Sequence, residues 1–302
     1  RPRAGHGQGR AGHRGLFPMK KRQVMKIFVI VFTALGLAYC GYLAMLYMGQ
    51  DSMVFPGRPV DPVREAEIRR YFPRLENFSV TAADGATLRG YYLPRTISGQ
   101  PAPAVLYFCG NAEEQTGFFL WSPNELRPYA VAGVDYRGYG RSGGVPTEAA
   151  LKSDALAVYD ALAARLGEHP RIVVMGRSLG TALAAYVAAR RPVAGIILVT
   201  PFASLAAVGQ ESHPFVPVRL LLKNPFDVVP DAAKVTAPAL FLVAGADRYV
   251  PPHHADRLAA SWPGPKEVRV IEGTGHGNIV DAPEYWKYVR EFVKARFASP
   301  QP

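Results

Sequence analysis

The longest hydrophobic stretch of the chain lies near its N-terminus. Residues 27–48 read IFVIVFTALGLAYCGYLAMLYM, and none of these 22 residues is charged. At about 1.5 Å of helical rise per residue, the stretch is long enough to cross a bilayer core of about 30 Å. It predicts one transmembrane helix over residues 27–48.

After this stretch, short apolar runs alternate with longer amphipathic ones, a pattern typical of a mostly parallel sheet flanked by helices. A mixed-charge linker is expected over residues 49–74, and one α/β domain over residues 75–299. Asp84-Gly85 predicts a hairpin turn between the first two strands, so the sheet should begin antiparallel and become parallel. The eight predicted strands cover residues 78–81, 87–93, 104–109, 130–136, 171–175, 194–200, 239–244 and 267–271. The predicted helices cover residues 114–126, 148–166, 179–190, 254–261 and 282–297.

One stretch, residues 201–231, interrupts the alternation. Prolines at positions 214, 217, 225 and 230 are interspersed there with apolar residues that include Phe215 and Leu220. A proline-rich apolar insertion directly after a strand predicts a small lid.

Positive charge is concentrated at the N-terminus. Residues 1–26 hold eight of the 35 Lys and Arg and no acidic residue, which leaves 27 basic and 24 acidic residues for the rest. A basic tail on a nearly neutral body favours membrane topology over nucleic-acid binding, so a membrane is the expected partner. Basic residues precede the hydrophobic stretch and Asp51 follows it, which predicts a cytoplasmic N-terminus and an extracytoplasmic domain.

A cleavable signal peptide is the alternative to a retained helix. Signal peptides have shorter apolar cores, and the small-x-small site Ala38-Tyr39-Cys40 lies inside the run and not after it. A buried core helix is disfavoured because the stretch is apolar on every face. Met19 opens a plausible Met-Lys-Lys-Arg start, and we assign no function to the residues before it.

The predicted strand 171–175 leads into Gly176-Arg177-Ser178-Leu179-Gly180 and then into an alanine-rich helix. Strand, tight turn and helix around GxSxG are the context of a nucleophile elbow, in which a Cβ at either glycine would clash. We predict that Ser178 is a catalytic nucleophile. A serine in an ordinary glycine-rich turn is the alternative.

A serine nucleophile needs a base, and the base needs a carboxylate that orients it. Asp247 and His276 directly follow the last two predicted strands, at the edge where parallel sheets bind ligands. They are the predicted acid and base. A solvated helix cap is the alternative for Asp247, and Asp227 is the reserve candidate. For the oxyanion, we expect the backbone amides of Leu179 and Asn111 as donors.

No cofactor or metal site is expected from the sequence. The GxGxxG match at residues 138–143 does not open directly into a helix, so a structural loop is preferred to a dinucleotide site. Two cysteines exclude a disulfide framework, and the seven histidines lack ligand-type spacing. His253 and His254 are expected to be surface residues entering a helix.

From about Phe72 onward the chain resembles the α/β-hydrolase superfamily, more narrowly the membrane-anchored abhydrolase-domain proteins, which include lysophospholipases and protein depalmitoylases. The similar segments are YFCGNA at 107–112, DYRGYGRS at 135–142, GRSLG at 176–180, DRYVP at 247–251 and GHGN at 275–278. The family usually has histidine at the position of Cys109. The resemblance implies an α/β-hydrolase fold and hydrolysis of carboxylic esters or thioesters through an acyl-enzyme on Ser178.

The predicted triad, transmembrane helix and lid together favour a serine hydrolase acting on lipid-like or acylated substrates. A peptidase of the same fold and a non-catalytic scaffold remain open alternatives. Transport by the hydrophobic stretch is disfavoured because it carries almost no polar residues. The sequence leaves the natural substrate and the oligomeric state undetermined.

Overall fold

The computed structural model of the chain describes residues 20–298. The chain divides into two compact units between Met48 and Gly49. The basic tail predicted over residues 1–26 lies mostly outside the described residues.

The first unit consists of a single long helix, α1, which runs from Lys21 to Val54 and continues into the second unit. The helix extends beyond the predicted 27–48 at both ends, because no proline or glycine pair stops it before Pro56. Its most apolar 18-residue window has a mean hydropathy of 2.1 and is not buried. Within the described part of the chain, α1 is the one helix long and apolar enough to cross a membrane.

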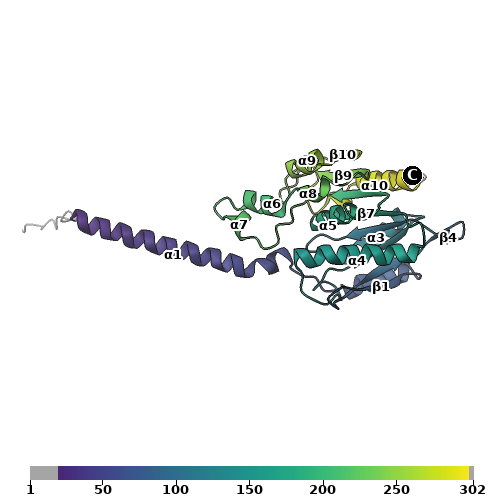
Figure 1. The fold of residues 1–302 in the computed structure, drawn as a ribbon, viewed down its shortest axis with the longest axis horizontal. Helices are drawn as coiled ribbons and strands as arrows, with labels where there is room; N and C mark the ends of the chain where they lie inside the picture. Colours follow the sequence, from purple (N-terminus) through teal and green to yellow (C-terminus); the bar gives the residue numbers. More distant parts are fainter. Residues whose placement is uncertain (1–19, 299–302) are drawn as a thin grey trace, which may run out of the picture. The chain divides into compact units, whose positions relative to one another are not determined.

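The second unit is built on a sheet with the strand order β1-β2-β6-β5-β7-β8-β9-β10 (Figure 1). β2 is antiparallel to both of its neighbours and all the other pairs from β6 to β10 are parallel, as predicted. A separate hairpin pairs β3 with β4. The strands are β1 (Glu76–Thr81), β2 (Thr87–Leu93), β3 (Thr96–Ile97), β4 (Gln100–Pro101), β5 (Ala104–Phe108), β6 (Ala130–Val134), β7 (Ile172–Arg177), β8 (Gly195–Val199), β9 (Ala239–Ala244) and β10 (Lys266–Ile271).

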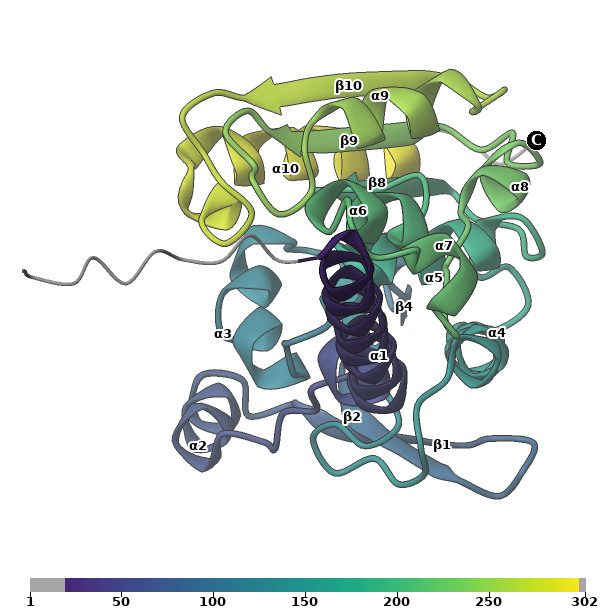
Figure 2. The same cartoon turned by 90° about the vertical axis from the view of Figure 1, so that its left-hand side faces the viewer.

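Helices cover both faces of the sheet. α2 and α3 lie on one side and α4 and α5 on the other (Figure 2). α10 shares the side of α3, since Phe118 and Trp121 of α3 line one cavity with Tyr285 and Trp286 of α10. The helices are α2 (Pro62–Tyr71), α3 (Gln115–Glu125), α4 (Glu148–Leu166), α5 (Leu179–Ala188), α6 (Leu205–Ser212), α7 (Val218–Leu221), α8 (Val229–Ala232), α9 (His253–Ala260), the 3₁₀ turn η1 (Ile279–Asp281) and α10 (Pro283–Ala298).

The central strands form the core. Every residue of β5, β6, β8 and β9 is buried, as expected for strands covered on both faces. Because β7, β8, β9 and β10 are parallel, the loops that follow them meet at one edge of the sheet. The candidate site lies at this edge.

Residues 49–74, predicted as a linker, are folded onto the domain. Asp61 caps α2 by accepting hydrogen bonds from the amides of Val63 and Arg64 at 2.9 and 3.2 Å. Phe55, Ile68 and Phe72 are buried in the core. The sequence pattern missed α2 because the helix is mostly polar and precedes the first strand, outside the strand–helix alternation.

The 201–231 segment contains α6, α7 and α8, and Figure 1 shows α6 and α7 beyond one end of the sheet. Phe202 and Phe226, near its ends, are buried. Phe215 and Leu220 in its middle are 87% and 86% exposed. The segment is therefore anchored at its base and exposes apolar side chains farther out.

Candidate active site

Ser178 stands at the junction of β7 and α5, with φ 49° and ψ −115°, a conformation that non-glycine residues rarely adopt. The two flanking glycines permit this turn. A Cβ at Gly176 would lie 2.2 Å from the carbonyl oxygen of Gly180, and a Cβ at Gly180 would lie 2.1 Å from that of Phe108. The predicted steric reason for both glycines is confirmed.

Asp247, His276 and Ser178 come together from three loops at the carboxyl edge of the sheet. The Nδ1–H of His276 donates to Oδ2 of Asp247 at 2.7 Å. The hydroxyl of Ser178 donates to Nε2 of His276 at 2.9 Å. With Nδ1 carrying the proton, Nε2 is the atom free to accept one from the serine. This arrangement can increase the nucleophilicity of the hydroxyl.

Asp247 is buried and hydrogen-bonded to its own loop. Its side chain is only 2% exposed, and its second oxygen accepts the amides of Tyr249 and Val250, each at 2.9 Å. Asp247 is thus not a solvated helix cap. Asp227, the reserve candidate, is exposed and forms an isolated β-bridge with Ser204.

The loop that follows β5 is fixed from several sides. The amide of Gly110 donates to Oε2 of Glu113 at 2.9 Å, and the hydroxyl of Tyr139 donates to the carbonyl oxygen of Asn111 at 2.6 Å. Because the Gly110 amide is engaged, Asn111 is the better candidate oxyanion donor in this loop. Leu179 is the first residue of α5, so its amide has no acceptor within the helix.

Cys109 occupies the position where the similar family usually has histidine. Its side chain is buried, and burial raises the pKa of the thiol well above its usual range, so the thiol stays neutral. The carbonyl oxygen of Cys109 accepts a hydrogen bond from the hydroxyl of Tyr136 at 2.6 Å. Tyrosine hydroxyls and Glu113 therefore hold this loop without an imidazole.

Arg177, which the sequence analysis did not single out, connects the two halves of the site. Its Nη2 donates to the carbonyl oxygens of His276 at 2.8 Å and Gly277 at 3.3 Å. Its Nη1 forms an ion pair with Glu113, the residue that holds Gly110. The sequence signal that could have identified Arg177 is its charge at a position expected to be buried, because a buried charge requires a partner.

A cavity of about 790 Å³ opens beside this network. Ala112 and Arg177, the chain neighbours of Asn111 and Ser178, lie in its wall. Part of the wall is aromatic, from α3 on one side and α10 on the other, and the rest is largely charged. The aromatic residues include Phe118, Trp121, Tyr285 and Trp286, and the charged ones include Arg58, Asp61, Arg64, Glu114 and Glu125. Its position beside the loops of the site makes it a candidate binding space.

The GxGxxG loop at residues 138–143 is packed against the protein itself. A Cβ at Gly140 would lie 1.9 Å from Oδ2 of Asp135. The hydroxyl of Ser142 donates to the carbonyl oxygen of Asp135 at 2.7 Å and accepts the amide of Arg89 at 2.8 Å. These contacts are those of a structural loop.

The fold and the elbow are those of an α/β hydrolase. A family model described as serine aminopeptidase, S33, matches residues 125–224. The chain belongs to the α/β-hydrolase superfamily and is a hydrolase of that fold. The predicted fold and the resemblance to this superfamily are thereby confirmed.

The uncharacterized protein Rv2307c of Mycobacterium tuberculosis is 32% identical over 91% of this chain and 96% of its own length. Alpha/beta hydrolase domain-containing protein 17B of Homo sapiens is 30% identical over 63% of this chain and 65% of its own. The esterase Pf2001 of Pyrococcus furiosus has a TM-score of 0.63 and 20% identity over 82% of this chain and 98% of its own. At that identity, the similarity to the esterase concerns the fold.

Proposed function

We propose that the chain is a membrane-anchored serine hydrolase that cleaves carboxylic esters or thioesters of lipid-like or acylated molecules. The observation that carries the proposal is the hydrogen-bonded series from Ser178 through His276 to Asp247.

In the proposed reaction, Oγ of Ser178 attacks the substrate carbonyl carbon while Nε2 of His276 takes the hydroxyl proton. Asp247 stabilises the resulting imidazolium. The amides of Leu179 and Asn111 donate to the tetrahedral oxyanion, and each such donor typically contributes about 10²- to 10³-fold in rate. Collapse expels the alkoxide or thiolate, which takes the proton from His276. Water activated by His276 then hydrolyses the acyl-enzyme and frees Ser178.

Three features support a lipid-like or acylated substrate. The cavity beside the loop of Asn111 has an aromatic part, between α3 and α10, that suits an apolar chain, and charged residues line the rest of its wall. Phe215 and Leu220 of the 201–231 segment expose apolar side chains of the kind that contact lipid. The helix α1 would keep the domain at a membrane surface where such substrates reside.

A fluorophosphonate probe tests the nucleophile. The full chain in detergent should be labelled, and Ser178→Ala should not, whereas Ser142→Ala in the neighbouring loop should be labelled like the wild type. Labelling that persists in Ser178→Ala contradicts the proposal. Labelling of the wild type would also exclude a non-catalytic scaffold, because a scaffold would not react with the probe.

A panel of substrates tests the reaction class. We expect activity on p-nitrophenyl esters that peaks at long acyl chains, together with activity on lysophospholipids or acyl thioesters. A peptidase is the second candidate, favoured by the match to the serine aminopeptidase family over residues 125–224. Faster cleavage of aminoacyl amides than of any ester would support the peptidase instead.

The proposed topology places the N-terminus in the cytoplasm and the domain on the other side, since basic residues precede α1. Glu168→Cys offers an exposed reporter in a background with Cys40→Ala and Cys109→Ala. A membrane-impermeant maleimide should label it in intact cells. Labelling only after lysis would reverse the orientation.

A further inference from the structure

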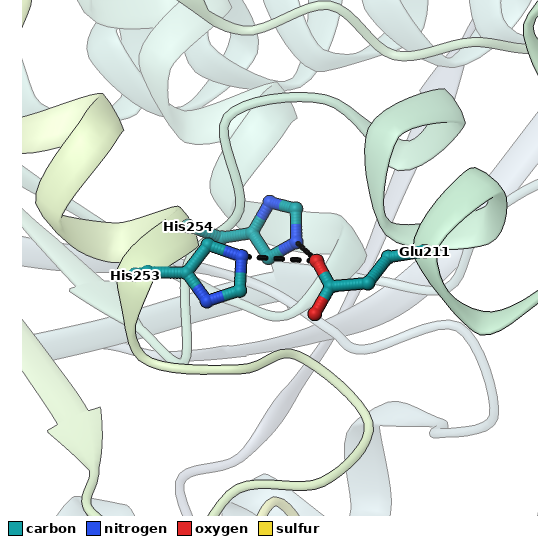
Figure 3. Close-up of side chains that lie close together, drawn as sticks. All are labelled: Glu211, His253 and His254. Atoms are coloured by element: carbon teal, nitrogen blue, oxygen red, sulfur yellow. Dashed lines mark hydrogen bonds and ion pairs between the residues drawn. The ribbon is translucent and has the colours of Figure 1, made fainter.

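Two histidines and a glutamate converge at a place separate from the triad (Figure 3). Glu211 belongs to α6, whereas His253 and His254 open α9. The Nε2 atoms of His253 and His254 lie 2.9 and 3.1 Å from the same oxygen of Glu211, Oε2. The two imidazole rings lie 4.5 Å apart. Three side chains therefore direct their ligand atoms to one point.

The spacing of these atoms fits a small cation. All three potential ligand atoms lie within 4.8 Å of one another. Tetrahedral zinc, with bonds of about 2.0–2.1 Å, requires ligand atoms about 3.3 Å apart, so small side-chain rotations suffice. Imidazole nitrogen and carboxylate oxygen are donors that zinc and similar transition metals bind well.

Burial differs among the three residues in a useful way. The side chain of His254 is 5% exposed, and those of His253 and Glu211 are 60% and 48% exposed. His254 is therefore not a surface residue, contrary to the sequence-based expectation. The two exposed partners leave a path for an ion and for water.

We propose that Glu211, His253 and His254 bind one divalent transition-metal ion such as zinc, with water as the fourth ligand. The ion would connect α6, in the 201–231 segment, to α9, which begins six residues after Asp247. It would brace these two helices against each other. Sequence patterns do not indicate this site, because two consecutive histidines have no ligand-type spacing and Glu211 lies 42 residues before His253.

Zinc binding to the untagged full chain in detergent tests the proposal. The background carries His6→Gln and His13→Gln, which removes the two tail histidines, and the protein is first dialysed against a chelator. Equilibrium dialysis with ZnCl₂ should give one ion per chain with a Kd below about 10 µM. Glu211→Gln, His253→Gln and His254→Gln should each weaken binding at least about tenfold. His169→Gln, which changes an exposed histidine elsewhere, should not.

Thermal melting supplies a second measurement. Zinc at about 100 times its Kd should raise the melting temperature of the wild type by at least about 4 °C, and should not do so for Glu211→Gln. Glu211 is exposed, so this variant keeps the fold even if His254→Gln does not. Unchanged zinc affinity in Glu211→Gln combined with His253→Gln, or no saturation below about 100 µM in the wild type, overturns the proposal and leaves a hydrogen-bonded cluster.

Discussion

Arg177 offers the sharpest test of how the site is held together. Replacing it with methionine keeps most of the side-chain volume and removes the charge. The change deletes the hydrogen bonds to the carbonyl oxygens of His276 and Gly277 and leaves Glu113 without its ion pair. Arg177 and Glu113 are only 14% and 28% exposed, so water restores little of this loss.

The expected cost follows from these contacts. Hydrogen bonds to charged groups typically contribute about 1.5–3 kcal/mol, so Arg177→Met should lose about 3 kcal/mol of stability. In a domain of this size that lowers the melting temperature by about 6–12 °C. Because the loop of His276 loses its support, kcat should fall about 10- to 100-fold, as a misplacement of about 1 Å can cost 10²-fold.

A double-mutant cycle separates the ion pair from the loop contacts. Glu113→Gln can still accept the amide of Gly110, so it should reduce kcat less than Arg177→Met does. The double variant should lose at least about 1 kcal/mol less free energy of unfolding than the two single variants lose together, because it leaves no unpaired buried charge. Melting and initial rates of ester hydrolysis provide both readouts.

The matched control is Arg191→Met, which breaks a bidentate pair with Asp160 on the surface. It should cost less than about 1 kcal/mol and leave kcat unchanged. The reasoning is refuted if Arg177→Met lowers the melting temperature as expected but keeps the kcat of the wild type. In that case the network would hold the fold without positioning His276.

Three further predictions concern the elbow, the acid and a buried carboxyl. Gly180→Ala should lower the free energy of unfolding by at least about 2 kcal/mol, because the added Cβ would lie 2.1 Å from the carbonyl oxygen of Phe108. Urea unfolding should show no such loss for Gly277→Ala, because a Cβ at Gly277 has no atom within 4 Å. Asp247→Asn should lower kcat about 10⁴-fold with little change in melting, since it disfavours the required tautomer of His276; a loss under tenfold would contradict this role. Burial raises the pKa of Asp135 to about 7, so its protonated form is favoured in the folded chain and stability is lost as pH rises through 7. Between pH 5 and pH 8, the free energy of unfolding of Asp135→Asn should therefore rise by about 3 kcal/mol relative to that of the wild type. Urea unfolding at the two pH values measures this change, and the same difference between variant and wild type at both would disprove the prediction.

The strand–helix alternation predicted the framework well. The eight predicted strands and five predicted helices of the domain all form, with ends within two residues of the expected ones. This works because strands covered on both faces must be continuously apolar, as β5 and β8 are. The strand order β2-β6-β5-β7 could not be predicted from the pattern, since it depends on which strands pair across the sheet.

What the sequence missed depends on contacts between distant residues. Glu113 and Arg177 are 64 positions apart, and nothing in their local sequence relates them. The same holds for Glu211 and His253. The short helices α6, α7 and α8 were missed for another reason, because prolines and short length leave no periodic pattern to read.

The bridge between Ser204 and Asp227 closes the base of the 201–231 segment. Because this bridge already holds the two ends together beside buried Phe202 and Phe226, a change of loop length near the exposed residues Phe215 and Leu220 adds little loop-closure entropy. The tip of the segment can therefore vary in length and sequence without displacing β8 or β9, which end and begin outside the bridge.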